Sequence, residues 1–138
     1  MDFGGMNYLA VLAAGVAGFV FGALYYTALA KPWMAAIGKT EEEIKANMSP
    51  VPYVIAGIAQ LVIAFMLAGV IGHLGTDMAT VRNGLITAFF IWLGFILTTM
   101  AVNHAFQGAK RSLTVIDSGH WLGVLLVQGL VIGLFGTP

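Results

Sequence analysis

Four long apolar stretches, separated by short polar segments, dominate the pattern of the chain. They cover about residues 7–30, 53–74, 81–103 and 118–135, and only Arg82, near one end, places a charge within them. About 20 helical residues cross the roughly 30 Å of hydrocarbon in a bilayer, and a helix satisfies its backbone groups within its own segment. The pattern therefore predicts an all-α, integral membrane four-helix transmembrane bundle that forms one domain over residues 1–138.

Small side chains recur at every fourth residue in the first two stretches. The first stripe consists of Ala10, Ala14, Gly18 and Gly22. The second stripe consists of Ala56, Gln60, Ala64, Ala68 and Gly72. Such stripes let helix backbones approach closely in lipid, so we expect the first two helices to pack against each other. Gln128 lies within the fourth stretch, where an amide is expected to bond across helices instead of facing lipid.

A short helix is also predicted in the loop between the first two stretches. In the run TEEE at residues 40–43, the Thr40 hydroxyl and the Glu43 carboxylate can each accept a hydrogen bond from an amide at a helix start. Ile44 and Met48 would present an apolar side to the membrane surface. We therefore expect a short interfacial helix here.

The distribution of basic residues predicts the orientation in the membrane. One group lies in the first loop and the third loop and consists of Lys31, Lys39, Lys45, Lys110 and Arg111. Only Arg82 lies on the opposite side. Short loops rich in lysine and arginine remain in the cytoplasm. Both termini are therefore expected to be non-cytoplasmic, in a multi-pass protein of the bacterial cell (inner) membrane.

The composition narrows the classes of partner. The chain is 59% hydrophobic and 9% charged, whereas an ordinary soluble domain is about 25% charged. The formal net charge is zero, so no basic face is available for nucleic acid. There is no cysteine, which excludes disulfides and thiolate metal sites. The expected partners are membrane lipids and either further copies of the chain or the subunits of a membrane complex.

His104, Asp117 and His120 are the weak candidates for catalysis. Asp117 and His120 are three residues apart, so they share a face of a helix, and a carboxylate beside an imidazole can orient a general base. With His104, a metal site with three ligands is conceivable. The alternative is that Asp117 caps the fourth helix while His120 anchors it at the interface. We favour capping, because no recognised metal-ligand spacing is present, and we expect no metal and no cofactor.

Tyr25, Tyr26, Lys31 and Trp33 raise a similar choice near the end of the first helix. They could line a site for a small molecule or a lipid headgroup at the inner surface. The alternative is an aromatic belt, which anchors helices at any membrane interface.

Two stretches carry a resemblance to a known family. They are GALYY at residues 22–26 followed by LAKPWM at residues 29–34, and VIDSGH at residues 115–120. In these stretches, and over nearly its whole length, the chain resembles a bacterial family of small membrane proteins catalogued as a domain of unknown function, 1761. Tyr25 stands where that family usually has tryptophan. The resemblance implies a four-helix membrane protein and implies no activity.

Three classes of function remain open. The small-residue stripes favour a structural or accessory protein that acts through helix–helix contacts, as a homo-oligomer or as a subunit of a complex. The alternative is a small oligomeric transporter or channel with Gln60, Gln128 and the Asp117–His120 group along its path. It ranks second because the hydrocarbon centre offers only amides and hydroxyls. An enzyme acting on a lipid or quinone at the inner interface ranks third, so the sequence leans against an enzyme.

Overall fold

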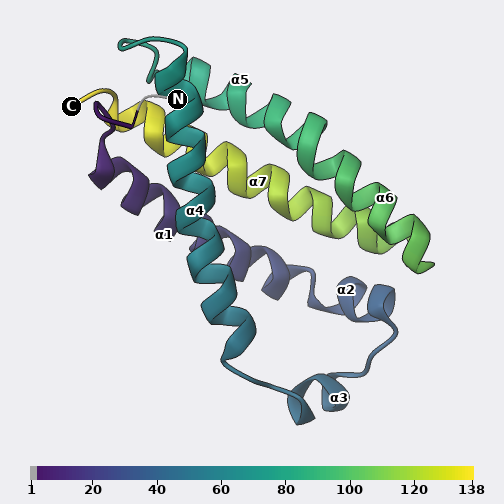
Figure 1. The fold of residues 1–138 in the computed structure, drawn as a ribbon. Coiled ribbons are helices and arrows are strands. Elements are labelled where there is room, and N and C mark those ends of the chain that lie inside the picture. The colour runs from purple at the N-terminus through teal and green to yellow at the C-terminus, as the bar shows by residue number, and fades with distance from the viewer. Residues whose placement is uncertain (1–2) are drawn as a thin grey trace.

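A computed structural model describes residues 3–138, and the described chain contains helices and no strands. Four helical segments are long and apolar enough to cross a membrane: Tyr8–Ala28, Val51–His73, Val81–Gln107 and Arg111–Phe135. These findings confirm the predicted all-α class and make the chain a multi-pass membrane protein. Figure 1 shows that both ends of the chain lie at the same end of the bundle, together with the loop after Val51–His73. We call this the terminal end.

Helix α1 (Tyr8–Ala28) begins at Asn7, whose side chain accepts a hydrogen bond from the Ala10 amide. It ends at Leu29, and the short helix α2 (Ala30–Ile37) then leads away in a new direction (Figure 1). The end of the bundle that carries α2 is called the α2 end here. The sequence pattern did not predict α2 as a separate helix.

Helix α3 (Glu41–Ala46) forms in the loop where a helix was expected. The Thr40 hydroxyl accepts a hydrogen bond from the Glu43 amide, as predicted for its start. Lys45 pairs with Glu41 at 3.0 Å, and this contact lowers the pKa of the Glu41 carboxyl below its ordinary value. Whether α3 lies at a membrane interface stays a prediction.

The third spanning segment is one continuous rod made of three parts. Helix α5 (Val81–Ile91) starts at Thr80, whose side chain accepts a hydrogen bond from the Asn83 amide. A π-helix, η1 (Trp92–Leu97), links it to α6 (Thr98–Gln107). The rod thus runs beyond the expected end at residue 103.

Helix α7 (Arg111–Phe135) is the centre of the bundle. It begins at Arg111, whereas the apolar pattern placed its start at Ser118. It contacts α1, α4 and α5, and Figure 1 shows it running between α1 and the α5–α6 rod. At its crossing with α5 the two backbones touch: a Cβ atom added at Gly84 would overlap the carbonyl oxygen of Gly129.

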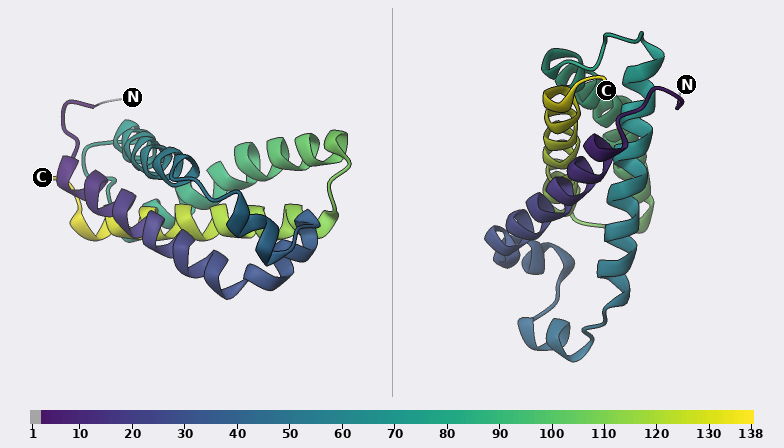
Figure 2. Two further views of the ribbon diagram at one scale, coloured as in Figure 1. Left: turned by 90° about the horizontal axis from the view of Figure 1, so that it is seen from below. Right: turned by 90° about the vertical axis from the view of Figure 1, so that its left-hand side faces the viewer.

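Helix α4 (Val51–His73) packs on the bundle along only part of its length. Its buried residues all lie between Gln60 and Ile71, close to the terminal end. Figures 1 and 2 both show its first half diverging from α1 and α7 towards α3. The side chains of Ile55 and Ile58 in that half are exposed. The predicted packing of α1 against α4 therefore occurs, but α1 packs on α7 as well.

Candidate functional site

Two glutamines meet in the middle of the bundle. Gln128 Nε2 donates hydrogen bonds to Gln60 Oε1 at 2.8 Å and to the Gln60 carbonyl oxygen at 3.2 Å. Both side chains are buried. Gly18 of α1 makes room for them, because a Cβ atom there would overlap Gln60 Oε1 and lie 2.8 Å from Gln128 Nε2. The small stripe of α1 therefore accommodates polar side chains from two other helices.

His120 of α7 packs against Gly22, the next residue of the α1 stripe after Gly18. A Cβ atom at Gly22 would lie 2.7 Å from His120 Nε2, so the missing side chain makes room for the imidazole. His120 as a whole is 7% exposed. Its ring lies 5.7 Å from the ring of Tyr25, 4.8 Å from that of Tyr26 and 4.7 Å from that of Trp121, measured between centroids. His120 Nδ1 is buried and has no hydrogen-bond partner in the described chain.

Tyr26 and Asp117 continue this line towards the α2 end. The Tyr26 hydroxyl donates a hydrogen bond of 2.7 Å to Asp117 Oδ1, and the Tyr25 hydroxyl donates one of 2.7 Å to the Ile116 carbonyl oxygen. The ring of Trp33, on α2, lies 6.0 Å from the ring of Tyr26. We call Gln60, Gln128, His120, Asp117 and Tyr26 the polar track.

The expectation that Asp117 caps the last helix is wrong. Helix α7 begins at Arg111 with Lys110 as its N-cap residue, so Asp117 lies inside the helix, nearly two turns from its start. At 1.5 Å per residue, Asp117 and His120 lie roughly 9 Å and 14 Å along the axis from Arg111. The polar and charged residues before Ser118 interrupt the apolar pattern without ending the helix. Both groups therefore lie within α7, one of the four helices long and apolar enough to cross a membrane.

His104 does not join this cluster. Its Nδ1 lies 2.8 Å from the Thr114 hydroxyl, a contact between α6 and the first turns of α7. In residues 3–138, no three histidine, aspartate or glutamate side chains are placed to hold a metal ion. The alternative of a site with His104, Asp117 and His120 as three metal ligands therefore finds no support. Lys31 is exposed on α2 and makes none of the hydrogen bonds that join α1 to α7.

The remaining predicted packing residues differ in burial. Those buried in the bundle are Ala10, Ala14, Gly18, Gly22, Gln60, Ala64 and Gln128. Those that are half-buried are Ala56, Ala68 and Gly72. The α1 stripe is thus enclosed along its whole length, whereas the α4 stripe is enclosed only in its middle.

Sequence reasoning missed the contacts between the α5–α6 rod and α7. Gly84 and Gly129 touch through their backbones, and Trp92 Nε1 donates a hydrogen bond of 2.8 Å to the Ser118 carbonyl oxygen. The available signal was the spacing of small residues, with Gly84 four residues before Ala88. Gly129 and Gly133 repeat that spacing on α7.

A comparison with protein families identifies the chain at family level. The model of the family described as "Protein of unknown function (DUF1761)" matches residues 9–133. The chain belongs to this family. The resemblance inferred from the two sequence stretches is thereby confirmed, and in this DUF1761 protein those stretches meet through the bonds of Tyr25 and Tyr26 to α7. Searches of curated proteins and of solved structures gave no match.

The polar track has a defined chemical capacity. The Tyr26 hydroxyl and the Asp117 carboxylate form a charge-assisted hydrogen bond. His120 Nδ1 and Gln128 Oε1 are buried and lack partners in the described chain. Buried polar atoms are normally satisfied by protein or water, so these two atoms are the unsatisfied positions of the polar track.

Proposed function

We propose that this protein is a small multi-pass transporter of the bacterial inner membrane, which moves a small polar solute along the polar track. The observation that carries the proposal is the position of Asp117 and His120 inside the spanning helix α7. Ionisable residues within a membrane-spanning segment are costly and commonly mark the path of a substrate or a proton. The sequence pattern ranked transport second because it placed only amides and hydroxyls at the hydrocarbon centre.

The arrangement of the track supports the same proposal. Asp117, His120 and Gln128 come from α7, and they face one side of α1 at Tyr26, Gly22 and Gly18 in turn. Ala14, Leu67 and Ile132 are buried and apolar and belong to the core cluster. We infer that these apolar residues close the path beyond the glutamine pair, in a state in which the solute is not passing.

Helix α2 would close the path at its own end. Trp33 lies against Tyr26, and the Lys110 Nζ donates a hydrogen bond of 3.1 Å to the Ala35 carbonyl oxygen, which joins α2 to the loop before α7. Leu29 is the only residue between α1 and α2. A change in its backbone angles would move Trp33 away from Tyr26 without disturbing α1.

The transport proposal is tested with the full chain in liposomes. Stopped-flow light scattering measures reswelling after a hyperosmotic pulse of urea, glycerol, glycine or ethanolamine. We expect faster reswelling than in protein-free liposomes for at least one solute. His120→Phe keeps an aromatic ring but removes the ring nitrogens, so it should abolish the increase, whereas Gly94→Leu, at an open position of η1, should retain it. Reswelling equal to that of empty liposomes for all four solutes would overturn the proposal.

The proposed orientation has its own test. The segments between the spanning helices at the α2 end, together with the start of α7, carry Lys39, Lys45 and Arg111, so we infer that this end is cytoplasmic and that both termini are periplasmic. A reporter fused after Pro138 should be accessible from the periplasm. Accessibility only from the cytoplasm would reverse the orientation and leave the polar track unchanged.

An accessory role through helix–helix contacts is the second candidate. It is favoured by the first half of α4, where no residue before Gln60 is buried, and the occupant we infer is a second copy of the chain. The chain has no cysteine, so Ile55→Cys introduces a single thiol. Bismaleimide should then cross-link a dimer in membranes, whereas Phe95→Cys, exposed on η1, should give monomer. Equal cross-linking at both positions would count against this role.

A further inference from the structure

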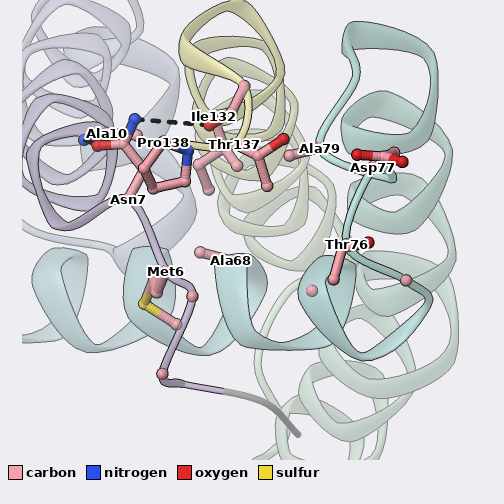
Figure 3. Close-up of a pocket in the computed structure, with 15 residues that line it drawn as sticks. Met6, Asn7, Ala10, Ala68, Thr76, Asp77, Ala79, Ile132, Thr137 and Pro138 are labelled. Carbon is pink, nitrogen blue, oxygen red and sulfur yellow. Dashed lines mark hydrogen bonds between the residues drawn. The ribbon is translucent and has the colours of Figure 1, made fainter.

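A cavity opens at the terminal end, away from the polar track. It has a volume of about 500 Å³ and is enclosed by the start of α1, the ends of α4 and α7 and the loop between α4 and α5. Figure 3 shows side chains from these segments around it. The lining residues include Asn7, Ala10, Ala68, Asp77, Ile132 and Thr137. Binding sites for small molecules commonly have volumes of about 300–1,000 Å³.

The floor of the cavity is apolar. Its apolar lining comes from Ala10 of α1, Ala68 of α4, Ile132 of α7 and Ala79 of the loop between α4 and α5. Ala10 and Ile132 are buried, whereas Ala68 and Ala79 are half-buried. Near the glutamine pair the α1 stripe is filled by polar side chains from other helices. At the terminal end the stripe residues, buried Ala10 and half-buried Ala68, both line the cavity.

The rim supplies hydrogen-bonding groups and one charge. Asp77 is the only charged side chain among the described residues that line the cavity. In the described part of the chain, no ion pair or hydrogen bond engages its carboxylate. Thr137 contributes a hydroxyl. The Asn7 Nδ2 makes only a long contact of 3.5 Å with the Gly136 carbonyl oxygen, so it remains able to bind a ligand.

We propose that this cavity binds a small organic amine, with its ammonium group at Asp77 and its apolar body against the part of the lining formed by Ala68 and Ala79. A carboxylate without a cationic partner attracts a positively charged group, and the apolar floor favours a ligand with a hydrocarbon body. Only the role of the cavity as an entry site for the transported solute rests on the proposed function. Amine binding is measured without transport, so a failure of the binding proposal and a failure of the transport proposal can be told apart.

The experiment is calorimetric titration of the purified full chain in detergent with 2-phenylethylamine. The control ligand, 2-phenylethanol, has the same body and no charge. We expect the amine to bind and the alcohol to bind about tenfold more weakly, the factor that follows from loss of one charge-assisted hydrogen bond. Equal affinity for both ligands, or no binding of the amine, would overturn the proposal.

Variants separate the charge from the shape of the cavity. Asp77→Asn, at an exposed position, should weaken amine binding about tenfold, while Glu42→Gln, an exposed carboxylate on α3, should leave it unchanged. Ala68→Leu should fill the floor and abolish binding of the amine. Circular dichroism confirms that each variant is folded. Full amine affinity in the Asp77→Asn variant would contradict the assignment.

The ammonium group could belong to a free amine or to a lipid headgroup. Titration in nanodiscs distinguishes the two sources. If phosphatidylethanolamine weakens binding of 2-phenylethylamine relative to phosphatidylglycerol, the lipid competes for the cavity. If the affinities agree, the cavity serves a free amine. Both results support an ammonium site, and loss of the Asp77 dependence in either lipid would contradict it.

Discussion

Helix α7 and the α5–α6 rod lie side by side but differ in hydropathy and in burial. The rod is the more apolar of the two, yet only 6% of its spanning window is buried, against 39% for α7. Large side chains such as Phe95 and Phe106 point away from the bundle, whereas α7 carries Asp117, His120 and Gln128. In lipid, apolar bulk does not drive helices together. Polar groups and small residues therefore determine which helix occupies the centre.

The largest effect should come from adding bulk to α7 where it meets α5. In Gly129→Leu the new side chain would overlap the backbone of Gly84, so we expect the free energy of unfolding in detergent to fall by about 3 kcal/mol. Gly94→Leu on the rod meets open space and should change it by less than about 0.5 kcal/mol. Equal losses would show that the two segments do not differ in packing.

Bulk in the α1 stripe should have the next largest effect. Gly18→Leu would separate the Gln60–Gln128 pair and leave buried amides without partners, at a cost of about 2 kcal/mol in the free energy of unfolding. Gly57→Leu, at an open position on α4, is the matched control and should melt like the parent chain. An unchanged melting temperature for Gly18→Leu would contradict the enclosure of this stripe by α4 and α7.

A smaller effect is expected where the rod does contact α7. Trp92→Phe keeps an aromatic ring but removes the hydrogen bond to the Ser118 carbonyl oxygen, so the free energy of unfolding should fall by about 1 kcal/mol. Chemical unfolding in mixed micelles measures the change. A loss comparable to that of Gly129→Leu would mean that the rod contributes more to the bundle than its exposure indicates.

The smallest effect should follow truncation of the most exposed side chain of the rod. Phe106 is 92% exposed, so Phe106→Ala should alter the free energy of unfolding by less than about 0.5 kcal/mol. The same unfolding measurement applies. A loss above about 2 kcal/mol, the size expected for a core phenylalanine, would place Phe106 in a contact between copies of the chain.

The spanning segments could be predicted because bilayer thickness fixes the length of an apolar helix. Their ends could not be predicted as well. Apolarity stops where the membrane stops, but a helix continues as long as its backbone bonds are made, and α7 therefore includes Arg111 and Asp117. That difference of seven residues changed the interpretation of Asp117 from a cap before the helix to a residue within it.

The members of the candidate site could be named from the sequence, but their grouping could not. Tyr26 and Asp117 are 91 residues apart. The sequence pattern placed Tyr26 in a headgroup site or an aromatic belt, and it considered Asp117 separately as a catalytic candidate or a helix cap. Spacing indicated that Gly18 and Gly22 face another helix, and it did not indicate which side chains fill the space. Only packing brings Gln128 and His120 to those glycines.

The π-helix η1 has a consequence for the direction in which α6 faces. Each residue turns an α-helix by roughly 100°, and a π segment is commonly a single-residue insertion into an α-helix. A chain with one residue fewer between Trp92 and Leu97 would therefore rotate α6 by roughly that angle about its axis. Gly84 would keep its crossing with Gly129, but His104 would swing away from Thr114. The π-helix thus sets the rotation of α6 about its axis relative to α5, so that both helices contact α7.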